Sequence, residues 1–229
     1  MAHSGIDILF QGQNFHRFLQ GFGVTLRVAV ITLLIGGVLG IVLGALRTLH
    51  NRPLQVILRL YLEIFRIVPT VVLLFVVYYI VPQLFHLDMS GELVAIVTFA
   101  LWTGAEMSDI VRGALIAVPQ HQVESAQALG LNRLQQLRYV LLPQALPVAL
   151  PGTINLATRI IKTTSLLLMI SVMDIVNVGQ TLVEANSHQH PAFAFWVYGI
   201  MFIMYYILCA PLSWWAKRIE KQRLERSNG

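Results

Sequence analysis

The chain has 229 residues, of which 56% are hydrophobic and only 12% are charged, and its mean hydropathy is +0.69. This composition is far more apolar than that of an average globular domain and indicates an integral membrane protein. The net charge is +5 and the pI is near 9.7, while a single cysteine excludes a disulfide framework and a thiolate metal site.

Five apolar runs approach the roughly 20 residues that a helix needs to cross the hydrocarbon core. We expect spans at residues 24–46, 67–81 with a more polar lead-in from 54, 93–118, 150–176 and 192–216. Residues 1–20 lack an apolar core long enough for a cleaved signal, so we expect a short outer surface segment there. The fold class is therefore an all-α integral membrane protein with five transmembrane helices in one domain, residues 1–229.

Basic residues are placed asymmetrically, which predicts the orientation of the chain. They follow the first, third and fifth spans: Arg47, Arg52, Arg59; Arg133, Arg138; and Lys217, Arg218, Lys221, Arg223, Arg226. The loops at 82–92 and 177–190 hold no Lys or Arg. Since basic residues beside a span stay on the cytoplasmic side, the N-terminus is predicted outside and the C-terminus inside, with 217–229 as a basic cytoplasmic tail. The positive charge indicates anionic lipid headgroups or an acidic partner and not nucleic acid.

Small residues recur along the first span. Gly36, Gly40 and Gly44 are four residues apart, so they share one helix face and permit another helix backbone to approach closely. Packing inside the bundle is the main interpretation, and a contact between subunits is the alternative.

The segment at 119–143, between the third and fourth spans, has the capping signals of a helix-turn-helix. Pro119 suits the start of a first helix and Gly130 suits the position just beyond its end. Asn132 and Gln135 form a capping-box pair at the start of a second helix, and Pro143 is expected to stop its extension. The small and polar side chains of the first helix favour docking in a groove of another protein.

Charged residues inside spans are functional candidates because their burial in lipid is costly. Glu106, Asp109 and Arg112 are three apart and therefore lie on one face of the third span. An internal ion pair between Asp109 and Arg112 is one interpretation. For Glu106, with Thr103 and Met107 beside it, we favour binding of a substrate ammonium or other cationic group.

The fourth span carries a polar stripe with spacings of four, three and three residues, formed by Asn155, Arg159, Lys162 and Ser165. Such a stripe is expensive when it faces lipid, so it is predicted to line a pathway or a subunit interface. The alternative is that Arg159 and Lys162 extend to lipid headgroups.

Five other positions have smaller expected roles. Glu63 and Arg66 are interpreted as a structural ion pair, and Asp174 as a candidate outer-gate residue at the end of the fourth span. His188 and His190 supply only two ligands, so no metal site is expected.

The loop at 119–143 also resembles the EAA loop of ABC importer permeases. The family pattern is Glu-Ala-Ala, three residues, Gly, nine residues, Ile, one residue, Leu and Pro. The matching positions, with Ser for the first Ala and Val for Ile, are Glu124, Ser125, Ala126, Gly130, Val140, Leu142 and Pro143. The resemblance implies coupling to a cytoplasmic ATPase, with Glu124 as the candidate polar or ionic contact and Gly130 as the turn that lets the helix project. The coupling residues are Glu124, Ser125, Ala126, Leu129, Gly130 and Pro143.

Further stretches resemble the polar amino-acid branch of these permeases, the histidine and glutamine type. They are GFGVTL, YLEIFRIVPTVVLLFVVYY, DIVRGAL and KTTSL, in chain order. The branch commonly has Arg-Gly-Thr-Pro where this chain has Arg-Ile-Val-Pro at 66–69, and Ala-Ala-Tyr where it has Gly-Ala-Glu at 104–106. These departures leave the substrate open.

The resemblance implies a multi-pass permease subunit of the bacterial cytoplasmic (inner) membrane that imports a polar amino acid, a class that includes the cationic ones. Its implied partners are a second identical or homologous permease subunit, two cytoplasmic ATP-binding subunits and an extracytoplasmic amino-acid-binding protein. The sequence has no Gly-rich loop ending in Gly-Lys-Ser or Gly-Lys-Thr, so the chain is not expected to be an enzyme, and ATP and Mg²⁺ are expected in the partner ATPase. The alternative is an ion-gradient-driven carrier that uses Glu106 and Asp109, although carriers usually show an internal repeat and none is evident.

Overall fold

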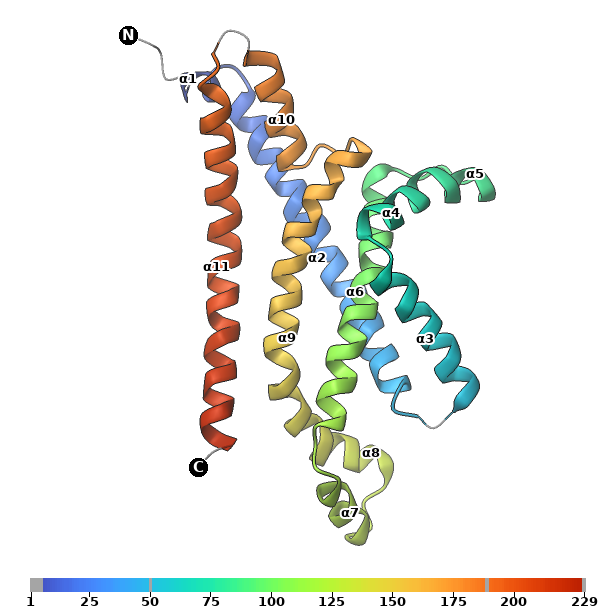
Figure 1. Cartoon of the computed structure of the whole chain (residues 1–229). Coiled ribbons are helices and arrows are strands. Elements are labelled where there is room, and N and C mark those ends of the chain that lie inside the picture. The colour runs from blue at the N-terminus through green and yellow to red at the C-terminus, as the bar shows by residue number, and fades with distance from the viewer. Residues whose placement is uncertain (1–5, 50, 188–189, 228–229) are drawn as a thin grey trace. The chain divides into compact units, whose positions relative to one another are not determined.

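The computed structural model describes residues 6–49, 51–187 and 190–227, and within these ranges the chain is helical and contains no strand (Figure 1). His188, residues 1–5 of the predicted surface segment and residues 228–229 of the predicted tail lie outside the described residues. The elements are α1 (Ile6–Leu9), α2 (Asn14–Leu46), α3 (Arg52–Ile67), α4 (Thr70–Phe75), η1 (Val76–Ile80), α5 (Val81–Phe85), α6 (Gly91–Ile116), α7 (Gln120–Ala128), α8 (Arg133–Gln136), η2 (Leu137–Leu141), α9 (Leu142–Thr163), η3 (Thr164–Ile170), α10 (Ile175–Asn186) and α11 (Phe193–Ser227).

Four helical stretches of the described chain are long and apolar enough to cross a membrane: Asn14–Leu46, Gly91–Ile116, Arg133–Ile170 and Phe193–Arg223. A fifth candidate is the pair Arg52–Ile67 and Thr70–Phe85, which is bent by 104°. Counted as one span, this pair brings the total to the five that the sequence predicts.

The bend in the second span follows from Pro69. The residue before a proline is pushed out of the helical region, because the proline ring meets its backbone. Val68 accordingly adopts an extended conformation, with φ −71° and ψ 130°, and ends α3. The expected single span is therefore two helices that meet at a break.

Pro143 does not stop the helix, and the prediction that it would is wrong. The elements α8, η2 and α9 follow one another without a gap, and Pro147 and Pro151 also lie inside α9. The residues before Pro143 form a π-helical turn, in which the Leu142 N–H donates to the carbonyl of Leu137. This wider turn relieves the usual conflict between a proline ring and the preceding turn.

The fourth span ends earlier than expected, and the next loop is mostly helical. The span ends at Ile170, and Ser171 turns the chain with a positive φ of 58°. The Asp174 carboxylate then accepts a hydrogen bond from the Asn177 N–H at 2.9 Å and caps α10. The expected open loop at 177–190 is thus replaced over most of its length by a capped helix.

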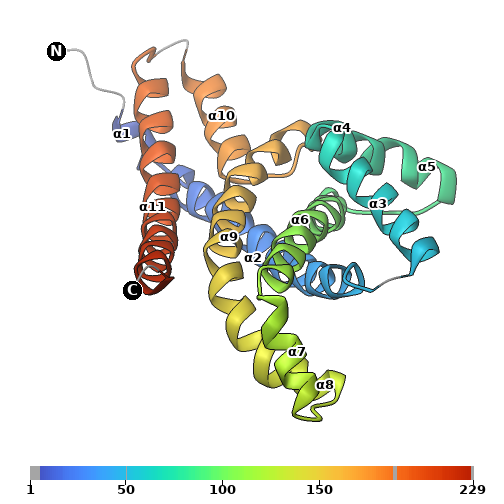
Figure 2. The ribbon, with the colours of Figure 1, turned by 60° about the horizontal axis from the view of Figure 1, so that its bottom comes forward.

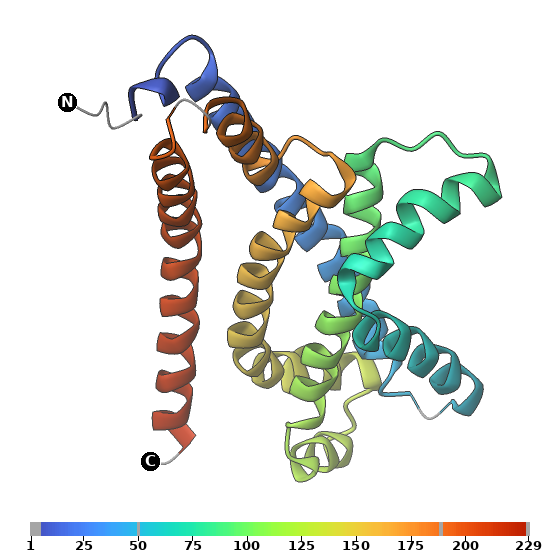
Figure 3. The same cartoon turned by 45° about the horizontal axis from the view of Figure 1, so that its top comes forward.

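The described chain divides into two compact units. The first comprises residues 1–33, 70–99 and 159–210. Within it, α1, α10 and the beginning of α11 gather around the first part of α2, as Figures 1 and 3 show. Two hydrophobic clusters hold it together, one with Phe18, Ile175, Phe193 and Val197 and one with Val28, Leu74, Phe99 and Leu167.

The second unit comprises residues 34–69, 100–158 and 211–229. Its core is a seam of small residues between α2 and α6. A Cβ atom added at Gly36 or Gly40 would lie 2.6 Å from Thr103 Cβ or 2.4 Å from Met107 Cβ, and one at Gly44 would lie 2.8 Å from Ser108 O. The predicted packing role of these three glycines inside the bundle is confirmed.

Candidate functional site

The turn after α7 is a Schellman motif, which fixes how the loop at 119–143 changes direction. The Leu131 N–H donates to the Ala126 carbonyl at 3.1 Å, and the Gly130 N–H donates to the Gln127 carbonyl at 2.9 Å. Gly130 has a positive φ of 76°, a conformation that favours glycine because it has no Cβ. The predicted end of the first helix at Gly130 is confirmed.

The second helix of the loop begins with a complete capping box. The Gln135 N–H donates to Asn132 Oδ1 at 3.0 Å, and the Asn132 N–H donates to Gln135 Oε1 at 2.9 Å. The buried Gln136 side chain donates to the Leu131 carbonyl at 2.6 Å. The predicted helix-turn-helix is therefore present and closed by local hydrogen bonds.

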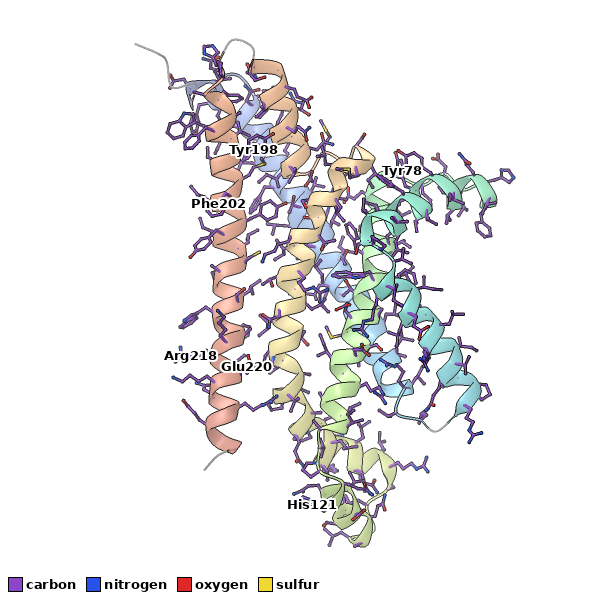
Figure 4. All side chains as sticks on the ribbon, in the orientation of Figure 1. Tyr78, His121, Tyr198, Phe202, Arg218 and Glu220 are labelled. Atoms are coloured by element: carbon purple, nitrogen blue, oxygen red, sulfur yellow. The ribbon has the colours of Figure 1, made fainter. Side chains whose placement is uncertain are left out.

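The loop exposes most of the side chains that the EAA pattern identifies. Figure 2 shows α7 and α8 beyond the end of α6, and Figure 4 labels His121 on α7. Glu124 is exposed and accepts a hydrogen bond from Gln120 at 2.8 Å, while Ala126 is buried. The predicted contacts Ser125, Gly130 and Pro143 are also exposed.

Two leucines of the loop are the most exposed of its large apolar side chains. Leu129 is 81% exposed and Leu134 is 73% exposed. Exposed apolar groups beside a charged carboxylate are typical of a protein-binding surface. The sequence analysis did not identify Leu134 as a contact residue, because the sequence alone does not distinguish an exposed leucine from a buried one.

A charged cluster in the second unit surrounds Asp109. Its two carboxylate oxygens pair with Arg47, in the turn just after α2, and with Arg66 of α3. Arg47 also donates to Ser108 Oγ at 2.9 Å, and Arg66 Nε lies 3.6 Å from Glu106 Oε1. The acids of α6 are thus neutralised by arginines from outside α6.

This pairing corrects two expectations. Asp109 pairs with Arg47 and Arg66 and not with Arg112. Glu63 pairs with Arg59 at 2.8 Å, one turn earlier on α3, and not with Arg66. The reason in both cases is that Arg66 reaches across to α6, where two acids compete for it.

Sequence reasoning missed Arg47 and Arg66 as members of this cluster. The available signal was charge balance, since Glu106 and Asp109 inside a span require cations from other spans. The sequence offers many arginines, and choosing among them requires the packing of α2, α3 and α6.

An open pocket of about 470 Å³ adjoins the cluster. Its lining comprises Arg47, Arg59, Leu62, Glu63, Arg66, Ile67 and Glu106. The lining presents guanidinium groups, which bind carboxylates, together with carboxylates, which bind ammonium groups. The pocket therefore offers both charges that a zwitterion requires.

Thr103 and Met107, predicted beside Glu106 in the pathway, are buried against α2. Thr153 of α9 lies 3.6 Å from the Met107 sulfur. Both side chains pack in the glycine seam, and their contact with a substrate stays a prediction.

The polar stripe of the fourth span lies on α9 and η3. Asn155, Arg159 and Lys162 are exposed, and Ser165 is half-buried and donates to the Lys162 carbonyl at 2.8 Å. Exposure fits either a pathway or an interface, so their role stays a prediction.

Asp174 lies in the first unit, outside the candidate spans. Its side chain is fully buried, and Oδ2 has no hydrogen-bond partner among the described residues. Burial raises the pKa of this carboxyl group to about 6, because desolvation disfavours the charged form, while hydrogen bonds from the backbone of Asn177 and Val176 act in the opposite direction. Its predicted role in an outer gate stays a prediction.

Within the described ranges, no three His, Cys, Asp or Glu side chains gather in a way that could hold a metal ion. The charged groups are instead organised as ion pairs and as an exposed loop. Such an arrangement can bind a charged solute and a protein partner.

Comparison with known proteins defines the class. Residues 36–224 match the family described as the inner membrane component of binding-protein-dependent transport systems. The chain belongs to this family of transport permease subunits, and it is a multi-pass membrane protein.

Individual relatives agree with this assignment. The chain is 34% identical over 206 residues to the L-cystine transport system permease protein of Bacillus subtilis, covering 87% of this chain and 84% of that protein. It is 30% identical over 205 residues to the glutamine transport system permease protein of Escherichia coli, covering 89% and 91%.

Solved structures share the fold. An amino acid ABC transporter crystallised with histidines superposes with a TM-score of 0.80 at 21% identity, covering 95% of this chain and all of that one. The inward-facing methionine ABC transporter superposes with a TM-score of 0.74 at 19% identity, covering 91% and 96%.

Proposed function

We propose that the chain is the transmembrane permease subunit of an ABC importer that takes up a polar amino acid. The observation that carries this function is the exposed, doubly capped loop at 119–143 in a member of the transport permease family. A rigid turn can transmit a displacement of α7 to the spans on either side, whereas a flexible loop would absorb it.

The proposed partners follow from the class. ABC importer systems combine permeases with ATPases and substrate-binding proteins, and we assign ATP and Mg²⁺ to a pair of cytoplasmic ATPase subunits. A second permease subunit and an extracytoplasmic amino-acid-binding protein complete the assembly. The proposed location is the bacterial cytoplasmic membrane, with the chain as one permease domain, the N-terminus outside and the basic tail inside.

The residues proposed to couple the loop to the ATPase are Glu124, Ser125, Ala126, Leu129, Gly130 and Pro143. Glu124 of α7 and Leu129, which caps this helix, are both exposed, so they offer an anionic and an apolar contact close together in the chain. Gly130 holds the turn, and the buried Ala126 anchors α7 to its own chain.

The substrate is proposed to bind near Glu106 and Asp109. Glu106 supplies a partner for an ammonium group, and Arg66 supplies one for a carboxylate, so a zwitterionic amino acid can replace their mutual contact at 3.6 Å. Thr103, Met107, Asn155, Arg159, Lys162 and Ser165 complete the proposed pathway. Permeases named for cystine and glutamine among the relatives agree with a polar amino acid. The comparisons lend no support to the ion-gradient-driven carrier.

The coupling contact is tested with two matched substitutions. Glu124 and Glu184 are both exposed, and each accepts a hydrogen bond from a glutamine four residues earlier, at 2.8 Å and 3.1 Å. The chain is purified with its ATPase as Glu124→Arg or Glu184→Arg, and both ATPase recovery and ATP-driven uptake are measured. Glu124→Arg is expected to lower both, and Glu184→Arg to lower neither. Unchanged assembly and uptake in Glu124→Arg would overturn the coupling assignment.

The substrate site is tested by uptake of labelled amino acids into vesicles containing the whole complex. Glu106→Gln is compared with Glu92→Gln, which removes a glutamate paired with Arg27 at 2.6 Å. Uptake is expected to fall in Glu106→Gln while ATPase recovery is kept. Equal uptake of every substrate by Glu106→Gln and the parent rules out this site.

A further inference from the structure

A second pocket of the second unit is lined almost wholly by cationic groups. It has a volume of about 280 Å³, and its lining comprises Arg47, Gln55, Arg59 and Arg112. No carboxylate contributes to this lining. Asp109 and Glu63 pair with two of the three guanidinium groups, but neither carboxylate lines this space, so an anion bound here would reduce the repulsion that remains.

The arginines retain hydrogen-bonding capacity toward this pocket. Arg112 is half-buried and has no ion pair among the described residues. The ion pair of Arg59 with Glu63 uses Nε, and the contacts of Arg47 with Ser108 and Asp109 use Nη1. Each guanidinium has five N–H donors, so all three can still donate to an anion.

Gln55 is held in position at the same pocket. Its Nε2 donates to the Leu49 carbonyl at 2.8 Å. An amide fixed at one end adds a neutral polar group beside the three cations. A tetrahedral phosphate, which accepts several hydrogen bonds at once, matches this set of donors better than a single carboxylate does.

The helix that carries Gln55 and Arg59 is amphipathic. Its apolar side chains Val56, Ile57, Leu60 and Ile64 are exposed, with exposed fractions of 67%, 65%, 60% and 43%. At the 3.6-residue period these four positions lie on the side away from Gln55 and Arg59. A helix with one apolar and one cationic side suits the boundary between headgroups and acyl chains.

We propose that Arg47, Gln55, Arg59 and Arg112 bind the phosphate of an anionic phospholipid. The acyl chains of that lipid run beside the exposed apolar side of α3. Basic pockets between membrane helices are suited to such headgroups. The bound lipid screens the three arginines from one another and holds α3 against α2 and α6, beside the cluster that contains Asp109.

The experiment titrates the full-length chain in detergent micelles with phosphatidylglycerol, phosphatidylcholine or inorganic phosphate. Bound lipid is counted by native mass spectrometry, and thermal stability is recorded in parallel. The variants are Arg112→Gln and Arg59→Gln, with Arg218→Gln as the control for an exposed arginine that lies outside the pocket. Since the Arg59 side chain is 81% exposed, Arg59→Gln tests the site without a buried substitution.

We expect phosphatidylglycerol to bind to the parent and to stabilise it. Arg112→Gln and Arg59→Gln should each bind this lipid about tenfold more weakly, because each variant loses one charge-assisted contact. Arg218→Gln should match the parent. Equal binding of phosphatidylcholine, or equal loss in Arg218→Gln, overturns the site. Stabilisation by inorganic phosphate as large as that by the lipid shows that a soluble phosphate is the ligand and overturns the lipid assignment.

Discussion

The seam between α2 and α6 predicts opposite effects of the same substitution at two neighbouring glycines. A Cβ at Gly40 would lie 2.4 Å from Met107 Cβ and 2.9 Å from the Gly104 carbonyl oxygen. A Cβ at Gly37, three residues earlier on the same helix, finds its nearest atom, the mobile Met107 Cε, at 4.0 Å. Gly40→Ala is therefore expected to destabilise the chain, and Gly37→Ala to stabilise it.

The magnitudes follow from these distances. Ordinary contact begins near 3.4 Å, so the Cβ at Gly40 requires the helices to separate locally by about 1 Å. Neither Met107 Cβ nor a backbone carbonyl can rotate away from the added methyl group. We therefore take the upper value of the free-energy cost of overpacking, about 3 kcal/mol. At either position, alanine has a higher helix propensity than glycine, which stabilises the helix by about 1 kcal/mol. The net effects are about 2 kcal/mol of destabilisation for Gly40→Ala and about 1 kcal/mol of stabilisation for Gly37→Ala.

The assay is thermal unfolding of the full chain in one detergent, with both variants measured beside the parent. A difference of about 3 kcal/mol between the variants corresponds to roughly 6–12 °C in Tm for a chain of this size. The comparison between the two variants cancels effects of the detergent. A Tm for Gly40→Ala equal to or above that of Gly37→Ala would refute the close approach of α2 to α6.

Three further outcomes are expected. Asp109→Asn, which leaves two arginines without their carboxylate, should lower Tm clearly more than Glu63→Gln, because the pair of Glu63 with Arg59 is exposed and screened by water; equal losses would contradict the paired cluster. Asn132→Ala removes the capping box and should cost about 1 kcal/mol, seen as faster limited proteolysis of the loop at 119–143, and an unchanged cleavage rate would count against a rigid loop. Burial raises the pKa of Asp174 to about 6 in the folded state. Between pH 4 and 6 the folded state therefore keeps a proton on this carboxyl group that the unfolded state has released, so the free energy of unfolding falls as pH rises through that window. Asp174→Asn should flatten this dependence and raise stability above pH 6 by up to about 3 kcal/mol, and an unflattened profile would show that another group titrates.

The spans and the capped loop could be predicted from the sequence because their signals are local. An apolar run of sufficient length identifies a membrane helix by itself. Both ends of α6 and the C-terminal end of α2 fall within two residues of expectation, whereas α2 begins at Asn14, ten residues before the expected start. Gly130 and the pair Asn132 and Gln135 determine a turn through groups only a few residues apart, and each made the predicted hydrogen bonds. Pro143 was misjudged because its effect depends on the π turn before it.

Only the tertiary structure decided which charges meet. Asp109 pairs with Arg47 and Arg66, which are 62 and 43 residues away along the chain, so helical spacing on α6 carried no information about either partner. Their approach depends on the glycine seam that brings α2 onto α6 and on the packing of α3 beside it. The energy of an ion pair falls with separation and with exposure to water, and both quantities are set by how the helices pack and not by the order of residues within any one of them.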